Sequence, residues 1–506
     1  MSGLNKQPNE SMSVPRRSVL LRNIFHLGLG QVATTALTIF QSAAIARTLG
    51  ASDFGLLYLL NSIATFAFVF VDWGHGPYVI REVAIHPHRT GEILGSVTAL
   101  RFGMTLITCA LAVALTWVFG YDLRTSILTG ALILGYLPQY LGLSCSWVFR
   151  GSERMGYDAL LQVVLKFSTL ALALACLALG GRLVALIPVY AAAGTITFVV
   201  AMAMYRRLAF PPLHVSGSTI RELVRHGAPL MAISLAVAVQ PYIDANILYA
   251  LVPQEVMGWY AAAWAITNTL VAPALIMGGA MYPQLARAAS QPGEFTRALR
   301  TAFRPLLFLA VLGAVGTYLF ADFAIGVLYS ERKFGPAADI LRAFAPALML
   351  IYIDMLFGYA IMAAGKAGQL AKAKIIAVVV TTAFEWVLIS WFQARFSNGG
   401  IGIVVAMAGG ELVMVTAAVV MIRHALERAM VVDVLRAVAA GAATILLMRV
   451  LPSVSPLVGI PLCVLTFAAM SAVVGLVTLA DTDALRHGFG RRSPVLPQTG
   501  AGVEPH

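Results

Sequence analysis

Long apolar segments follow one another along almost the whole chain, separated by short stretches with charge, glycine or proline. A helix needs about 20 consecutive apolar residues to cross a bilayer. A chain built this way has little sequence left for a water-soluble domain. Only 11% of its 506 residues are charged, against about 25% in soluble domains. The sequence therefore predicts an all-α integral membrane protein and excludes an ordinary soluble enzyme, a disordered chain and a disulfide-rich secreted scaffold.

The apolar pattern predicts about fourteen transmembrane helices. They cover residues 24–46, 55–73, 93–118, 125–146, 159–179, 184–204, 228–251, 259–283, 305–328, 339–363, 375–394, 401–422, 437–448 and 457–479. The thirteenth segment is too short to span alone, so we expect Arg436 and Arg449 to extend from its ends toward the two membrane surfaces.

The lysines and arginines between the helices predict the orientation. The connections on the side of the two termini hold 25 of these residues, and the opposite connections hold 7. Because cytoplasmic loops carry the excess of positive charge, we expect both termini to be cytoplasmic, with tails at 1–23 and 480–506.

A weak internal repeat appears at a spacing near 203 residues. Residues 49–58 resemble residues 251–260, with Gly55 over Gly258. Each stretch links the first two helices of a block of six. The repeat predicts an N-lobe at 24–204 and a C-lobe at 228–422, related by an axis along the membrane normal, followed by an extra helix pair at 437–479.

Several classes of site are not expected. No Walker A motif occurs, the longest predicted extracytoplasmic connection is residues 329–338, and the basic residues are scattered rather than gathered on a nucleic-acid-binding face. The four cysteines lie singly in apolar segments without metal-ligand spacing. We therefore expect no cofactor, no metal site, no catalytic residues and no nucleic-acid partner.

Six ionisable residues lie near the middle of predicted membrane helices, and these are the candidate functional residues: Arg101, Lys166, Asp244, Asp354, Glu385 and Glu411. Each costs about 2.5 to 3.5 kcal/mol near the bilayer centre. Most of them must therefore face a wet or paired interior rather than lipid.

The two cations fall in the first lobe and the four carboxylates in the second. We expect Arg101 and Lys166 to hold an anionic group of a substrate, and the carboxylates to bind a coupling cation. The alternative is that these groups form structural ion pairs, or that the two cations extend to the cytoplasmic surface.

Charges at the predicted helix ends have simpler expected roles. Asp339 and Arg342, three residues apart, are expected to pair locally. Asp72, at the end of the second predicted helix, is expected to be solvated.

Eight short motifs occur in order along the chain, at residues 49–55, 80–82, 149–155, 244–249, 258–264, 282–283, 364–366 and 399–402. Together they resemble the polysaccharide transporters of the multidrug/oligosaccharidyl-lipid/polysaccharide exporter superfamily, which include the Wzx-type O-antigen flippases. Asp244 and Glu411 match family positions. Arg101, Lys166, Asp354 and Glu385 are proposed from their depth in the helices alone.

The resemblance implies a flippase of the bacterial inner membrane rather than an enzyme. Its substrate would be an undecaprenyl-diphosphate-linked oligosaccharide, moved from the cytoplasmic to the periplasmic leaflet by alternating access, coupled to H⁺ or Na⁺. The product would serve O-antigen, lipopolysaccharide or exopolysaccharide synthesis, together with other polysaccharide-assembly proteins.

Two other functions remain open at this stage. One is a multidrug or small-cation antiporter of the same fold. The other is an integral-membrane polysaccharide polymerase or ligase, although the short external connections offer little material for a catalytic site.

Overall fold

The computed structural model describes residues 34–450 and 455–477, and the described chain is almost entirely helical, with no strand. A first helix runs through residues 34–49. It is followed by α2 (Ala51–Asp72), α3 (His75–Ile85), the 3₁₀ turn η1 (Pro87–Arg89), α4 (Thr90–Val118), α5 (Leu123–Gly151), α6 (Met155–Ala178), α7 (Leu183–Arg207) and α8 (Gly217–Leu251).

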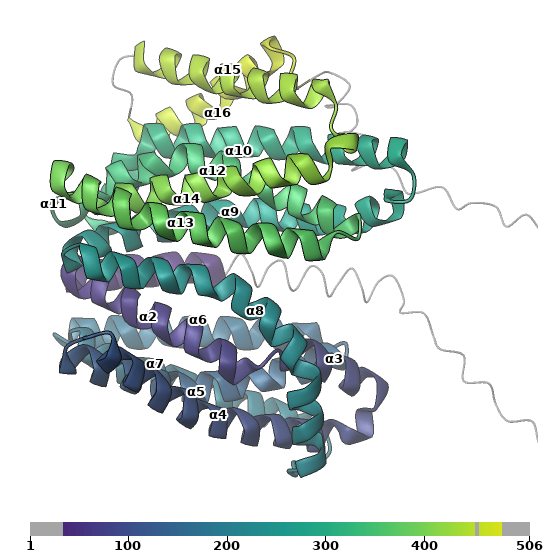
Figure 1. Ribbon diagram of the computed structural model, residues 1–506. Helices are drawn as coiled ribbons and strands as arrows, with labels where there is room; N and C mark the ends of the chain where they lie inside the picture. The colour runs from purple at the N-terminus through teal and green to yellow at the C-terminus, as the bar shows by residue number, and fades with distance from the viewer. Residues whose placement is uncertain (1–33, 451–454, 478–506) are drawn as a thin grey trace, which may run out of the picture. The chain divides into compact units, whose positions relative to one another are not determined.

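The second half of the chain continues the pattern. It contains α9 (Gln254–Ala288), α10 (Pro292–Tyr329), α11 (Glu331–Phe334), α12 (Ala337–Ala363), α13 (Ala367–Phe396), α14 (Gly399–Met421), the 3₁₀ turn η2 (Arg423–Ala425), α15 (Arg428–Val450) and α16 (Pro456–Val473). Figure 1 shows these helices, with the colour running from purple to yellow along the chain.

Twelve helices in the described ranges are long and apolar enough to cross a membrane. The all-α membrane fold is thus confirmed. All fourteen predicted segments coincide with helices, at least in their described parts, but α8 and residues 34–49 are not among the twelve. The count of fourteen crossings stays a prediction. The tails at 1–23 and 480–506 lie outside the described residues.

The structure lengthens the thirteenth helix. Segment 437–448 is the core of α15, which has 23 residues and is one of the twelve possible spans. In its polar first turns, the buried carboxylate of Asp433 accepts two hydrogen bonds, of 3.0 and 3.1 Å, from Arg304 of α10. An arginine–carboxylate pair of this geometry fixes the orientation of both side chains.

The described residues form two compact units. The first contains residues 34–272, 321–347 and 371–414, and the second contains 273–320, 348–370, 415–450 and 455–477. The predicted lobes at 24–204 and 228–422 follow the order of helices along the chain instead, and they stay a prediction.

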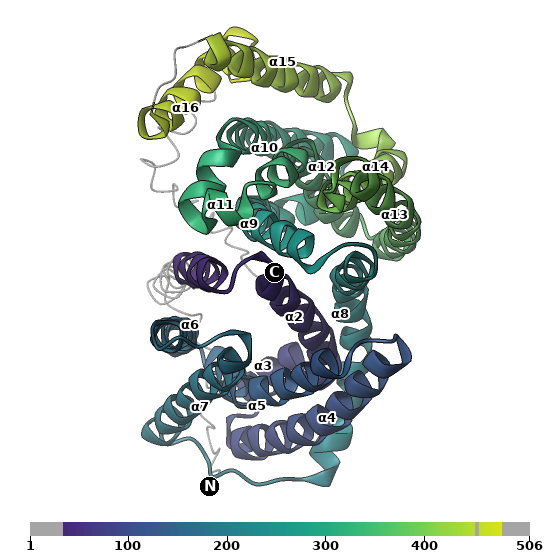
Figure 2. The same ribbon diagram turned by 90° about the vertical axis from the view of Figure 1, so that its left-hand side faces the viewer.

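In the first unit, α5 is the central packing element of the N-terminal half. It packs against α4, α6 and α7, while α2 packs against α4 and α8. Figure 2, a view turned by 90°, shows α4, α5 and α7 lying side by side. The core of this unit is continuous from residues 45–71 of the first helices to the start of α9.

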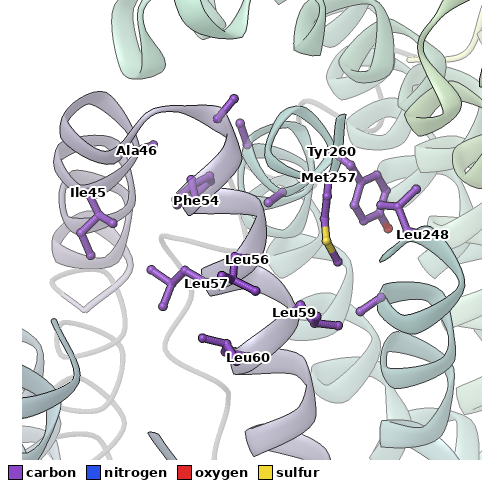
Figure 3. Packing of buried hydrophobic residues seen from close by; sticks show 14 of the residues in the cluster. Ile45, Ala46, Phe54, Leu56, Leu57, Leu59, Leu60, Leu248, Met257 and Tyr260 are labelled. Atoms are coloured by element: carbon purple, nitrogen blue, oxygen red, sulfur yellow. The ribbon is translucent and has the colours of Figure 1, made fainter. Parts of the chain in front are cut away.

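The start of α2 and the start of α9 touch backbone to backbone. A Cβ added to Gly55 would overlap the carbonyl oxygen of Gln254, and a Cβ added to Gly258 would overlap that of Ala51. Residues 51 and 254 are 203 apart, as are 55 and 258. The contact is therefore reciprocal, which is the pattern that a two-fold axis between the two repeats would produce. Figure 3 shows this region of the core, with Met257 and Tyr260 of α9 beside Leu248 of α8.

In the second unit, α15 and α16 pack against each other and against α10. Gly441 lies against Val311, and the ring centroids of Phe308 and Phe467 are 5.0 Å apart. The predicted C-terminal helix pair therefore exists as a packed element within the described residues.

Candidate functional site

A hollow lies in the first unit among residues 34–49, α2, α5, α6, α7 and the first half of α9. We call it the chamber. Its wall combines amides, aromatic rings and one ammonium group: Gln41, Asn61, Gln139, Tyr58, Tyr136, Tyr140, Tyr190, Trp264 and Lys166. A wall of this composition offers many hydrogen-bonding groups and flat apolar faces but very little charge.

The amides and rings of the chamber support one another. The Tyr136 hydroxyl donates a hydrogen bond to the side-chain oxygen of Asn61, and its ring lies 5.3 Å from that of Tyr190, edge to face. The Tyr140 ring is stacked on Phe68, with centroids 3.7 Å apart. These contacts hold the polar groups in fixed positions, so the chamber is largely preformed.

Among the described residues that line the chamber, Lys166 of α6 is the only lysine or arginine. Within residues 34–450 and 455–477, no hydrogen bond or ion pair to its ammonium group is recorded. Its side chain is half-buried at mid-helix. A cation held there without a protein partner can offer its charge to a ligand in the chamber.

Arg101 of α4 has a different environment. Its side chain is 1% exposed and lies with its guanidinium 4.1 Å from the Trp147 ring centroid. It donates hydrogen bonds to the Asp72 carboxylate, to the Tyr140 carbonyl oxygen and, at 2.7 Å, to the Ser144 hydroxyl. It does not line the chamber.

The carboxylate partner of Arg101 lies beside a break in the second membrane segment. Asp72 is the last residue of α2, and Trp73 (φ 43°) and Gly74 (φ 70°) are left-handed before α3 begins. A hollow lies at the break, lined by Asp72, His75, Tyr140 and Trp147 among others. The Asp72 side chain is partly exposed, as expected of a boundary residue, and it is also the ion-pair partner of Arg101, which the sequence did not indicate.

Asp244 of α8 and Glu385 of α13 come together, although they are far apart in sequence. Their carboxyl groups are within hydrogen-bonding reach of each other. The Gln240 amide donates to an oxygen of Asp244 and, at 3.4 Å, to Oε1 of Glu385. Asp244 is 3% exposed and Glu385 0%. We call these two residues the carboxyl pair.

The carboxyl pair has acceptor oxygens left over. Oε2 of Glu385 and Oε1 of Gln240 are buried without a hydrogen-bond partner in the described part of the chain. Two like charges in contact in a low-dielectric interior cannot both persist without a counter-charge. The arrangement therefore suits a bound proton or small cation.

The other two predicted carboxylates lie elsewhere. Asp354 of α12 belongs to the second compact unit. Glu411 of α14 belongs to the first, and the neighbouring Gly410 packs closely on Thr381, one turn before Glu385 on α13. Both side chains are half-buried. Neither lines the chamber. Asp339 and Arg342 pair at 2.8 Å as predicted, and Arg342 also binds Asp322.

Sequence reasoning missed the aromatic and amide residues of the chamber and Gln240. A signal was present, because Gln41, Asn61, Gln139 and Gln240 are carboxamides within otherwise apolar helices. A buried amide needs hydrogen-bond partners just as a buried charge does, only at lower cost. Searching for ionisable groups alone passes over such residues.

The helical membrane fold, the polar chamber and the buried charged groups define a class of protein, the polytopic membrane transporters. Among solved structures, the fold is similar to the lipid II flippase MurJ in an inward closed conformation, with a TM-score of 0.68 and 14% identity, covering 88% of this chain and 98% of that one. It is also similar to an inward-facing multidrug resistance MATE family transporter of the MOP superfamily, with a TM-score of 0.62 and 16% identity, covering 80% and 98%.

A curated relative is the probable low-salt glycan biosynthesis flippase Agl15 of Haloferax volcanii, 24% identical over 407 residues, which cover 78% of this chain and 81% of that protein. Residues 20–289 match the family described as polysaccharide biosynthesis protein, so the chain belongs to this family. The predicted family resemblance is confirmed. Family and fold together make the protein a transporter rather than an enzyme, which removes the polymerase or ligase alternative.

Proposed function

We propose that this protein is a flippase that moves a lipid-linked oligosaccharide across the bacterial inner membrane by cation-coupled alternating access. The glycan occupies the chamber, Lys166 pairs with an anionic group of the substrate, and the carboxyl pair binds the coupling H⁺ or Na⁺. Undecaprenyl diphosphate is the lipid carrier, and both termini are cytoplasmic.

The single observation that carries this proposal is the composition of the chamber wall. A sugar ring has C–H groups on its faces and hydroxyls at its edge. Rings such as Tyr190 and Trp264 suit the faces, and carboxamides such as Gln41 and Gln139 can both donate to and accept from hydroxyls. A hydrophobic drug would bind better to a chamber wall with fewer polar groups.

The charges of the chamber agree with an anionic carrier. Lys166 supplies positive charge in its wall, and no aspartate or glutamate is among the described residues that line it. Arg101 is bound to Asp72, so we propose that it stabilises the helix packing around it and does not contact the substrate. Asp354 and Glu411 remain candidates for the cation pathway.

A strain lacking the gene for this chain tests the proposal. It is complemented with the wild type, Lys166→Gln, or the exposed-lysine control Lys372→Gln, and protein levels in the membrane are matched by immunoblot. We expect the wild type and the control to restore surface polysaccharide. Lys166→Gln should leave lipid-linked repeat units on the cytoplasmic face, protected from a membrane-impermeant oxidant such as periodate.

Two results would contradict the proposal. Repeat units that reach the periplasmic leaflet in the uncomplemented strain would show that another protein flips them. Full surface polysaccharide from Lys166→Gln would remove the role given to the lysine.

The similarity to a MATE transporter keeps a second function in view, a multidrug or small-cation antiporter of the same fold. Expression in a drug-hypersensitive strain lacking its own exporters separates the two. Increased resistance that depends on Glu385 would favour the antiporter, and unchanged resistance with restored polysaccharide would favour the flippase.

A further inference from the structure

The chamber and the carboxyl pair are separate sites, and the described structure shows one short path between them. Tyr58 of α2 lines the chamber. Tyr260 of α9 lies directly behind it, buried to 1% exposure. The two rings meet edge to face with centroids 5.8 Å apart, and their hydroxyls are within hydrogen-bonding reach.

Both phenols also interact with the carboxyl pair. Tyr58 and Tyr260 each interact electrostatically with Asp244 and with Glu385. Tyr58 thus borders the chamber, Tyr260 is in contact with Tyr58, and both phenols lie near the carboxyl pair. They come from four helices of one compact unit, α2, α9, α8 and α13.

We propose that Tyr58 and Tyr260 couple substrate occupancy of the chamber to proton loading of the carboxyl pair. The inference rests on the proposed function and deepens it, because it commits to the proton and names the residues that connect the two sites. Tyr58 and Tyr260 act as positioning residues, since neither is required to give up its own proton.

The physical basis is that a hydroxyl both donates and accepts. When the carboxyl pair is deprotonated, a phenol hydrogen turned toward it is favoured by the negative charge. Tyr260 then accepts from Tyr58, and Tyr58 presents only acceptor lone pairs to the chamber. When the pair is protonated that attraction weakens, Tyr260 can donate to Tyr58, and Tyr58 can donate to a ligand hydroxyl. The direction of one hydrogen-bond chain thus depends on both sites.

The surroundings of the carboxyl pair favour a proton over Na⁺. Carboxyl groups already within hydrogen-bonding reach can share one proton, whereas a hard metal ion needs several oxygen ligands spread around it. No group of three or more aspartate, glutamate, histidine or cysteine side chains placed to hold a metal occurs among the described residues. Around the pair, α8 supplies Asp244 and Gln240, α13 supplies Glu385 and the more distant Lys374, and α2 and α9 supply the two phenols. α14, packed on α13, carries Glu411.

The first test needs no ligand. Full-length protein in liposomes is titrated by infrared spectroscopy, and the protonated-carboxyl band that disappears in Glu385→Gln is followed with pH. Tyr58→Phe, which removes only the hydroxyl, should shift the frequency or the midpoint of this band. Tyr190→Phe, a second chamber tyrosine, should leave it as in the wild type. A band unmoved by Tyr58→Phe, or moved equally by Tyr190→Phe, overturns the proposal.

The second test measures the coupling itself with a defined probe, undecaprenyl-diphosphate-linked N-acetylglucosamine. Because linkage is reciprocal, probe affinity must depend on pH if the sites are coupled, and we expect a change of about fivefold or more between about pH 5 and about pH 8. In Tyr58→Phe and Tyr260→Phe this dependence should fall below about twofold, with Tyr190→Phe as the control.

The outcomes separate the two proposals. A pH dependence lost in Glu385→Gln but kept in Tyr58→Phe overturns the tyrosine coupling and leaves the carboxyl pair in its proposed role. A dependence on Na⁺ instead of pH overturns the proton assignment. A wild type that does not bind the probe counts against the proposed substrate, and the infrared titration still decides the link between Tyr58 and the carboxyl pair.

Discussion

Lys166 and Arg101 both lie inside long apolar helices of one compact unit, yet their surroundings differ. Arg101 is enclosed by Asp72, Ser144 and Trp147: its two terminal nitrogens already donate hydrogen bonds, and only its buried Nε has no partner among the described residues. Lys166 faces the chamber, and no partner of its ammonium group is found among the described residues. The comparison shows that depth in the membrane identifies a costly charge, and that only its partners indicate whether the charge is structural or available.

The largest effect is expected on the stability of the Arg101 site. Arg101→Ala removes several buried hydrogen bonds and the stacking on Trp147, and should lower the free energy of unfolding by about 3 kcal/mol. This loss of stability is measured by thermal unfolding of the detergent-purified protein. Lys166→Ala is the matched variant and should unfold close to the wild-type temperature. Equal losses from both variants would erase the distinction between the two sites.

Trp147 in the Arg101 site and Trp264 in the chamber wall allow a second comparison of the two sites. Trp147→Ala, which removes the ring under Arg101, should cost about 2 kcal/mol of stability. Trp264→Ala, in the chamber wall, should act mainly on transport. Unfolding temperature and surface polysaccharide are measured for both. A Trp147→Ala protein of normal stability that fails to transport would give the Arg101 region a direct functional role.

A smaller effect is expected from Lys166→Gln, because it removes a charge but keeps the length and polarity of the side chain. Loss of one charge-assisted contact of about 1.4 kcal/mol or more corresponds to a fall in transport rate of about tenfold or more. Initial rates of lipid-linked glycan flipping in proteoliposomes provide the measurement. A rate within twofold of the wild type, beside an unaffected Lys372→Gln, would contradict it.

The smallest effects come from exchanging the two cations. Lys166→Arg keeps the charge in a spacious chamber and should change transport by less than about threefold. Arg101→Lys loses the planar group that stacks on Trp147 and binds three partners, so it should still lower the unfolding temperature measurably. If lysine serves as well as arginine at 101, the stacking and hydrogen-bond geometry described for that site contribute little.

Much of the fold was predictable because a bilayer imposes a length and an apolar composition on each crossing. Every predicted apolar segment contains a helix in its described part, and errors occur where helices continue past the apolar core or, as in α16, end at Val473, before the predicted segment does. The polar first turns of α15 are an example. They are held by Arg304 and Asp433, a pair 129 residues apart that no local pattern reveals.

Of the candidate site, the sequence indicated the ionisable residues but neither the amides and aromatic rings nor the arrangement. Mid-membrane depth singled out Asp244 and Glu385, and it could not show that they meet or that Gln240 bonds to both. It also gave Arg101 and Lys166 the same role, because the partner of Arg101 is contributed by the end of another helix. The roles of these residues depend on which side chains they meet in the folded protein, and a single sequence does not state those contacts directly.

The reciprocal contact of Gly55 and Gly258 has a mechanical consequence. Backbone lies against backbone there, with a single recorded side-chain hydrogen bond between the two stretches, from Ser52 to Gln254 at 3.1 Å. Helices that meet through interlocked side chains must change rotamers before they can part. At the two glycines no side chains interlock, so this point of contact can open or close without a rotamer change, whereas one turn further along α2 and α9 also meet through the rings of Tyr58 and Tyr260. A methyl group added at Gly55 or Gly258 would push the two helices apart at this point.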